Sequence, residues 1–216
     1  MRGDTIIVEE HHRQAAAEIV PALLPIIRET GEKHTISVAG ESGSGKSETA
    51  TAIASALAKE GIDSVIFQQD DYFVYPPRSN DRARRDDIAW VGPQEVRLDL
   101  LDEHLNAFRN GAASIDKPLV VYETDSVTAE DMPTAGVRVA IAEGTYATLL
   151  ENVDIRLFIA RDYEETRVHR EKRKRDAAEL DPFIDEVLKI EHAIISGHRV
   201  RADIVINADY SVLAKD

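Results

Sequence analysis

The sequence predicts an α/β fold in which a mostly parallel sheet of about five strands is flanked by helices. Two observations support this prediction. Short apolar runs, typical of buried strands, alternate along the chain with longer segments of helical periodicity, which is the pattern of βαβ units. A glycine-rich stretch, residues 40–45, separates the first of these strands from the helix that follows it. Ligands of such sheets bind beyond the carboxyl ends of the strands, so we expect the functional residues there.

The N-terminal elements can be placed from periodicity. We expect a helix over residues 12–30, kinked or split by Pro21 and Pro25, because proline removes a helical hydrogen bond. A short apolar run at residues 35–39 predicts the first strand. Residues 46–60 predict a helix, since their apolar side chains recur on one face.

The middle of the chain is less regular. A second strand is expected at residues 64–67, and residues 70–92 predict a long loop, because they carry many charges and show no period. A helix is expected over residues 93–109, with Pro93 in its first turn. The remaining elements are strands at residues 119–122, 137–142, 155–159 and 204–206, and helices at residues 162–178 and 182–195.

Length and composition exclude several classes of protein. The 216 residues fit one domain, with or without a small lid, and the absence of cysteine excludes disulfides and thiolate zinc sites. The formal net charge of -14 argues against binding to nucleic acid or to an anionic membrane. No segment approaches the roughly 20 apolar residues that span a bilayer, and the N-terminus does not resemble a signal peptide, so we expect a cytoplasmic protein.

The glycine-rich stretch is part of a phosphate-binding motif. Residues 40–47, Gly-Glu-Ser-Gly-Ser-Gly-Lys-Ser, match G-x-x-x-x-G-K-[ST] between a predicted strand and a predicted helix. Glycines let successive N–H groups face the phosphates, Lys46 is expected to reach the β- and γ-phosphates, and Ser47 is expected to ligate Mg²⁺. The motif therefore predicts a P-loop NTPase fold that binds ATP. The residues expected to contact the nucleotide are Gly40, Ser42, Gly43, Ser44, Gly45, Lys46, Ser47 and Glu48.

Acidic side chains follow two of the predicted strands. Asp70 and Asp71 come after strand 64–67, where a carboxylate can accept the proton of an attacking hydroxyl or help to hold Mg²⁺. A polar loop without a catalytic role is the alternative, and of two adjacent acids only one is expected to face the crevice. Glu143 ends strand 137–142, where an acid can lie near Mg²⁺, although many strands end in this way.

Two groups of basic residues stand out in this acidic chain. Six of the nine residues from Arg167 to Arg175 are Lys or Arg, and Arg167 and Arg170 share a helix face. We interpret residues 162–180 as a basic helical lid over ATP, with a solvated charged helix as the alternative. The second group could hold an anionic substrate, but we favour pairing with neighbouring aspartates. Its members are Arg78, Arg82, Arg84 and Arg85, and the aspartates are Asp81, Asp86 and Asp87.

Taken in order, these motifs resemble the uridine kinase and phosphoribulokinase family of P-loop kinases, over about residues 35–207. The order of the short motifs is more specific than any one of them. After the phosphate loop they are Gln69-Asp70, a helix begun by Pro93, Val121-Tyr122-Glu123, Glu143-Gly144, Thr166-Arg167 and the strand Ala202-Asp203-Ile204-Val205-Ile206.

The resemblance implies roles for several residues. Asp70 would orient or deprotonate the acceptor hydroxyl, and Glu143 would serve the Mg²⁺ and substrate region. The expected catalytic residues are Lys46, Asp70, Arg167 and Arg170, and the expected acceptor site contains Asp70, Tyr72, Tyr122 and Glu143. Uridine-cytidine kinases usually carry Tyr-Asp and then a histidine, but here the pair is Tyr122-Glu123 and no histidine lies between His104 and His169. The acceptor is therefore open among nucleosides, sugars, sugar phosphates and vitamin precursors.

We therefore expect ATP-dependent phosphoryl transfer to a hydroxyl of a small metabolite. The alternatives are an ATP-hydrolysing switch or sensor and a nucleoside monophosphate kinase. Residues 1–34 are expected to form an extension that packs on a kinase domain of residues 35–216. The expected partner is a small-molecule acceptor, with no nucleic acid or membrane, and the sequence leaves a homo-oligomer open.

Overall fold

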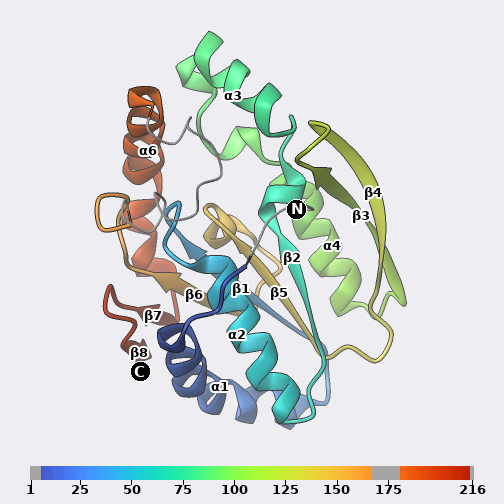
Figure 1. Ribbon diagram of the computed structural model, residues 1–216. Helices are drawn as coiled ribbons and strands as arrows, with labels where there is room; N and C mark the ends of the chain where they lie inside the picture. The colour runs from blue at the N-terminus through green and yellow to red at the C-terminus, as the bar shows by residue number, and fades with distance from the viewer. Residues whose placement is uncertain (1–5, 167–180, 215–216) are drawn as a thin grey trace.

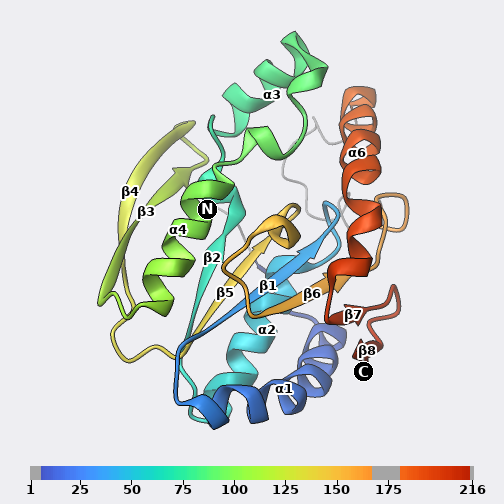
Figure 2. The same ribbon diagram turned by 180° about the vertical axis from the view of Figure 1, so that it is seen from behind.

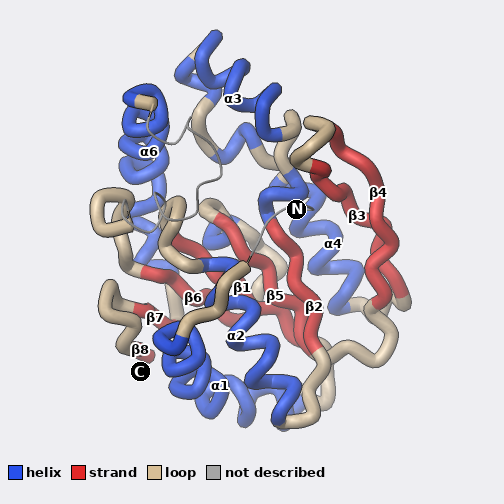
Figure 3. Tube along the Cα trace, in the orientation of Figure 1, coloured by secondary structure: helices blue, strands red, loops and turns tan. Residues whose placement is uncertain are grey.

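The strands of the protein form two separate sheets. A computed structural model describes residues 6–166 and 181–214. The larger sheet consists of β1 (His34–Gly40), β2 (Ser64–Gln68), β5 (Val139–Gly144), β6 (Ile155–Ile159), β7 (Ile204–Ile206) and β8 (Val212–Ala214). A separate antiparallel hairpin consists of β3 (Ser114–Val121) and β4 (Ser126–Pro133). In space the larger sheet has the order β2-β5-β1-β6-β7-β8, and the hairpin stands apart from it (Figures 1 and 3).

Four helices of the described residues cover the faces of the larger sheet, and α3 (Pro77–Asp86) lies beyond its end (Figure 1). The four are α1 (Glu10–Thr30), α2 (Lys46–Lys59), α4 (Leu98–Arg109) and α6 (Pro182–Ile195). Short 3₁₀ segments are η1 (Gln69–Tyr72), η2 (Ile88–Trp90), η3 (Pro93–Glu95), η4 (Ala147–Leu149) and η6 (Ser196–Arg201). The two opposite views show α1 and α2 on one face and α4 and α6 on the other (Figures 1 and 2). The predicted α/β class is confirmed.

Successive strand residues alternate between two cores, as the strand period of two requires. Ile36 and Ile141 are buried in a cluster with the apolar side chains of α1 and α2. Ala39 and Ala142 belong to a second cluster, which includes the apolar side chains of α4. Strands buried on both faces read as continuous apolar runs, which is why their positions were predictable from the sequence.

The register of the parallel strands sets where the functional residues meet. β1 pairs in parallel with β5 and β6, β2 pairs with β5, and β6 pairs with β7. Within the larger sheet, β8 pairs antiparallel with β7, so the five parallel strands carry one additional edge strand. Val38 and Gln68 both lie opposite Glu143. The segments that follow β1, β2 and β5 therefore leave the sheet at one edge, side by side.

The N-terminal helix is one continuous element, so of the two predicted effects of its prolines, a kink or a split, the split does not occur. α1 runs from Glu10 to Thr30 with Pro21 and Pro25 inside it. Both prolines are exposed, where water can reach the carbonyl groups that they leave without an N–H partner. The opposite side of the helix buries Ile19 and other apolar side chains against α2 and the sheet, which holds the helix together. No helix in the described residues combines the length and apolar character needed to cross a membrane.

Three other predictions need correction in the middle of the chain. Residues 70–92 are not an irregular loop, because they contain α3, whose sequence is almost entirely polar and so has no apolar period. The predicted helix over residues 93–109 is divided, since Pro93 begins η3 and α4 starts at Leu98. The strand expected at residues 119–122 begins at Ser114, and β4 was not predicted because most of its side chains face solvent. Most of the predicted helix over 162–178 lies outside the described residues.

Candidate active site

The glycine-rich motif forms the turn between β1 and α2. Gly43 and Gly45 have φ angles of 75° and 95°, which residues with a Cβ atom rarely adopt. A Cβ on Gly45 would also lie 2.5 Å from the hydroxyl of Tyr210. That hydroxyl donates to the carbonyl of Ser44 (3.0 Å) and lies 3.2 Å from Nε2 of the buried His12. The N-terminal helix and the C-terminal segment thus support the loop from behind.

The loop presents groups that suit a phosphate. Lys46 Nζ donates to the carbonyl of Glu41 (2.9 Å), inside the same turn. The Ser44 hydroxyl is buried and has no hydrogen-bond partner among the described residues. A buried hydroxyl of this kind, at the N-terminus of α2, is what a phosphate oxygen would satisfy. Glu48 is also buried, its carboxylate would oppose a phosphate charge, and its contact with the nucleotide stays a prediction.

Ser47 and Glu143 form a pair that suits Mg²⁺. The Ser47 hydroxyl donates to Glu143 Oε1 (2.9 Å), and Glu143 is 4% exposed at the end of β5. Burial and the negative charge of Asp70 raise the pKa of Glu143 to about 7, against the opposing effects of Lys46 and the Ser47 hydrogen bond. No cluster of three or more His, Cys, Asp or Glu side chains suited to a metal occurs in the described residues. Mg²⁺ needs none, because it takes one or two protein oxygens together with phosphates and waters.

Asp70 and Asp71 are adjacent in η1 but point to different environments. Gln69 anchors the segment, since its side chain is buried and accepts from the backbone N–H of Tyr146 (2.7 Å). The Asp71 carboxylate is buried, and it accepts from Lys117 Nζ (2.8 Å) and from the N–H of Val120 (3.0 Å). Asp70 is exposed and accepts no hydrogen bond from the described residues. Gln68, two residues before Asp70, lies opposite Glu143 in the sheet, so the strand register favours Asp70 as the acid of the crevice.

A cavity of about 250 Å³ lies beside Asp70. Its walls come from η1, from α3, from the hairpin and from α6. The lining residues are Asp70, Phe73, Pro77, Asn80, Asp81, Arg84, Tyr122 and Ile184. Tyr122 lies at the cavity, where the acceptor is expected. Tyr72 does not, because its side chain is fully buried and its hydroxyl lies 2.8 Å from His104 Nδ1.

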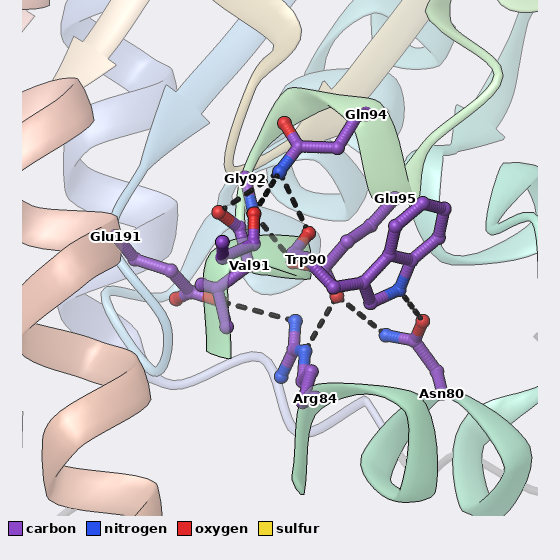
Figure 4. Close-up of polar contacts among 9 residues, drawn as sticks. Asn80, Arg84, Trp90, Val91, Gly92, Gln94, Glu95 and Glu191 are labelled. Atoms are coloured by element: carbon purple, nitrogen blue, oxygen red, sulfur yellow. Dashed lines mark hydrogen bonds and ion pairs between the residues drawn. The ribbon is translucent and has the colours of Figure 1, made fainter. Parts of the chain in front are cut away.

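Two residues of the cavity lining, Asn80 and Arg84, belong to a network of polar side chains (Figure 4). Arg84 Nε donates to Glu95 (2.5 Å), and its terminal nitrogen lies 3.4 Å from Glu191 on α6. Asn80 donates to Glu95 (2.6 Å) and accepts from the indole N–H of Trp90 (2.9 Å). Burial would lower the pKa of Arg84, but the two glutamates outweigh it and hold the pKa above its ordinary value. Glu95 and Glu191 escaped the sequence analysis, because no local pattern indicates such distant partners.

The expected pairing of the loop arginines with nearby aspartates holds for one of them. Arg85 contacts Asp81 (2.8 Å), and also Asp181 (2.7 Å) at the start of α6. Arg84 instead pairs with the two glutamates of the network. The positive charges of Arg84 and Arg85 are therefore both balanced by carboxylates of the protein.

The phosphate loop is joined to the segments that flank the predicted lid. Glu41 Oε1 lies 2.7 Å from His192 Nδ1 on α6, and Glu41 Oε2 accepts from the N–H of Tyr163 (2.7 Å). The hydroxyl of Thr166 donates to the carbonyl of Ser42 (3.0 Å). Arg167 and Arg170 lie outside the described residues, so their role on a lid stays a prediction.

The motif order and the geometry agree with a comparison to known families. The sequence profile of the Phosphoribulokinase / Uridine kinase family matches residues 35–191. The chain belongs to this family. The resemblance seen in the motif order is thereby confirmed, and the matched region contains the phosphate loop, Asp70, Glu143 and most of α6. The family's P-loop fold agrees with the observed sheet.

Two relatives of this chain carry the names of different kinases. A bifunctional alpha-galactosidase/sucrose kinase of Mediterraneibacter gnavus is 30% identical over 189 residues, which cover 82% of this chain and 20% of that protein. A uridine kinase of Ureaplasma parvum serovar 3 is 28% identical over 139 residues, covering 62% of this chain and 66% of that enzyme. The chain thus spans less than two thirds of either relative.

A solved structure shares the fold. The D-glycerate 3-kinase from Cryptococcus neoformans superposes with a TM-score of 0.64 at 13% identity, covering 96% of this chain and 100% of that one. At this identity the likeness establishes the architecture alone. The family and the fold therefore do not identify the acceptor, and the cavity provides the remaining information about it.

Proposed function

We propose that the protein is a kinase that transfers the γ-phosphoryl group of ATP to a hydroxyl group of a small metabolite. The position of Asp70 is the observation that supports this function most. Asp70 comes two residues after Gln68, which lies opposite Glu143 in the sheet, and it also lines the cavity of about 250 Å³. A carboxylate between a phosphate site and a cavity is placed to act on a hydroxyl bound in that cavity.

The residues divide the work of the reaction between them. The N–H groups of the phosphate loop and Lys46 bind the phosphates and orient the γ-phosphoryl group. Ser47 and Glu143 would hold Mg²⁺, which when bound neutralises charge on the phosphate oxygens. Asp70 accepts a hydrogen bond from the acceptor hydroxyl and aims its oxygen at the γ-phosphorus. It takes the proton as the new O–P bond forms and the bond between the γ-phosphorus and the bridging oxygen breaks, so that ADP leaves. Arg167 and Arg170 are proposed to stabilise the transferred group from the lid.

The cavity favours this function over a nucleotide-hydrolysing switch. A switch that hydrolyses ATP needs only water as the acceptor, and it has no use for an enclosed site beside the base. The names of the two curated relatives, a sucrose kinase and a uridine kinase, also point to acceptors that carry hydroxyl groups. We infer the activity from these observations together.

The test is ADP release from Mg-ATP in the presence of different acceptors. We expect one class of hydroxyl compound to stimulate release and to be recovered as its phosphate ester. Asp70→Asn should lower this turnover by about 10²- to 10⁴-fold, the usual contribution of a general base, while a titration with nucleotide shows unchanged ATP affinity. Asp86→Asn is the matched control, because Asp86 is exposed on α3 and does not line the cavity. Normal turnover by Asp70→Asn, or ATP hydrolysis that no acceptor changes, would refute the proposal.

A further inference from the structure

We infer that the acceptor is an uncharged compound rich in hydroxyl groups, a sugar or a polyol, rather than a sugar phosphate, a carboxylic acid or a pyrimidine nucleoside. This inference rests on the proposed function, because it concerns the cavity beside Asp70. Three features of the cavity lead to it: its charge, the hydrogen-bonding character of its polar atoms, and its apolar walls.

The charge of the cavity disfavours an anion. Arg84 is the basic residue of the described lining, and the guanidinium of Arg78 lies 5.9 Å from the ring centroid of the lining residue Tyr122. Two carboxylates already engage Arg84, those of the fully buried Glu95 and of Glu191, so this part of the wall has no net positive charge (Figure 4). Asp70 and Asp81 add two further acidic side chains to the lining. A phosphate or carboxylate on the acceptor would therefore meet charge of its own sign in a partly enclosed site, which opposes binding.

Two carboxylates of the cavity lining, Asp70 and Asp81, offer hydrogen-bond acceptors beside the N–H donors of Arg84 and the hydroxyl of Tyr122. The Asp70 carboxylate accepts none from the described residues, and Asp81 uses only Oδ2, toward Arg85. Asn80 adds little, because both ends of its amide are occupied, by Glu95 and by Trp90. Carboxylates accept hydrogen bonds and do not donate them, so they need a ligand with many donors. Hydroxyl groups meet this need, whereas phosphates, carboxylates and the two carbonyl groups of uracil are acceptors themselves.

The remaining walls suit the carbon skeleton of a sugar. Phe73 and Tyr122 contribute aromatic rings, and Pro77 and Ile184 contribute aliphatic surface. The C–H groups on one face of a sugar can pack against an aromatic ring while its hydroxyl groups point to the acids. The cavity, at about 250 Å³, is smaller than the roughly 300–1,000 Å³ of sites for drug-sized ligands, which indicates a compact acceptor. The relative named as a sucrose kinase agrees with a carbohydrate acceptor.

The experiment compares acceptors that differ in charge, with two readouts. Fructose, sucrose and sorbitol are compared with fructose 6-phosphate, gluconate, glycerate and uridine. Binding is measured by calorimetry in the presence of Mg-ADP, and phosphoryl transfer is measured by ADP release with isolation of the ester. We expect a neutral sugar or polyol to bind and to be phosphorylated with a kcat/KM at least about 100-fold above its anionic counterpart, since like charges across a contact cost several kcal/mol.

A variant of Asp81 tests whether its carboxylate accepts a hydrogen bond from a hydroxyl group of the bound compound. Asp81→Ala should lower kcat/KM for the neutral acceptor by about 10- to 100-fold, because a hydrogen bond to a charged group is lost, with little change in the KM for ATP. Asp86→Ala, on the same helix and away from the cavity, is the matched control and should leave both values unchanged. Equal kcat/KM for Asp81→Ala and the wild type would overturn this assignment.

The two readouts separate the inference from the proposed function. Fastest transfer to an anionic acceptor or to uridine would overturn the inference and leave the kinase function standing. Binding of a neutral polyol without phosphoryl transfer would support the inference and refute the kinase function. Failure of every neutral compound to bind at millimolar concentration would overturn the inference.

Discussion

The neighbours Asp70 and Asp71 should separate activity from stability when each is changed to asparagine. The Asp71 side chain is 2% exposed and the side chain of its partner Lys117 is 3% exposed, with 2.8 Å between Oδ2 and Nζ. Asp71→Asn removes the negative charge but keeps an oxygen for the N–H of Val120. Lys117 then retains Glu130 as its carboxylate partner, at 3.2 Å, and that side chain is 43% exposed.

The size of the effect follows from this arrangement. Removing one member of a buried ion pair usually costs about 3–5 kcal/mol, because the other charge stays buried. Glu130 still reaches Lys117, so we expect the lower end, about 3 kcal/mol of unfolding free energy. For a protein of this length, 1 kcal/mol shifts Tm by about 2–4 °C, which gives a fall of about 6–12 °C for Asp71→Asn. Asp70→Asn should stay within about 0.5 kcal/mol of the wild type, since Asp70 is exposed and accepts no hydrogen bond from the described residues.

Thermal and urea unfolding followed by circular dichroism measure these differences, and ADP release measures the loss of activity in Asp70→Asn. The double variant Asp71→Asn/Lys117→Met is the control, because it removes the buried positive charge as well. We expect the double variant to be more stable than Asp71→Asn alone. A wild-type Tm for Asp71→Asn, or a double variant no more stable than the single one, would refute the reasoning.

Three further predictions concern the phosphate loop and the cavity wall. Lys46→Ala should lower ADP release by at least about 10²-fold with unchanged circular dichroism, because it removes the cation of the loop; an active variant would contradict its role. Gly45→Ala should lower the unfolding free energy measured in urea by about 1–3 kcal/mol, since φ is 95° and the new Cβ would lie 2.5 Å from the Tyr210 hydroxyl. Adding Tyr210→Phe removes that hydroxyl but leaves the strain at φ, so the double variant should not recover all of the lost stability. Burial raises the pKa of Glu191 above its ordinary value of 4.5, so the folded state holds this proton more tightly and stability declines as the pH rises above that value. In Glu191→Gln the decline of Tm with pH should therefore be weaker than in the wild type. Identical profiles of Tm against pH would contradict a raised pKa of Glu191 in the folded state.

Contiguous residues account for what could be predicted before the structure. The phosphate loop is a run of eight residues whose glycines, lysine and serine act through their own backbone and their own helix, so its conformation follows from local sequence. The parallel strands are buried on both faces and appear as apolar runs, which makes the sheet predictable as well. The family follows from the order of these local motifs.

Tertiary structure decided everything that depends on a distant partner. Asp70 and Asp71 have the same chemistry and neighbouring positions, and only the contact of Asp71 with Lys117, 46 residues away, turns one acid inward and leaves the other in the crevice. Helix α3 is held by polar contacts with Glu95 and Glu191, which lie outside the helix. It therefore needs no apolar face, and its sequence shows no apolar period. The sequence by itself therefore determined the phosphate-loop motif and the fold class. Only the folded chain determined the cavity beside Asp70, since its charge depends on side chains that lie far apart in sequence.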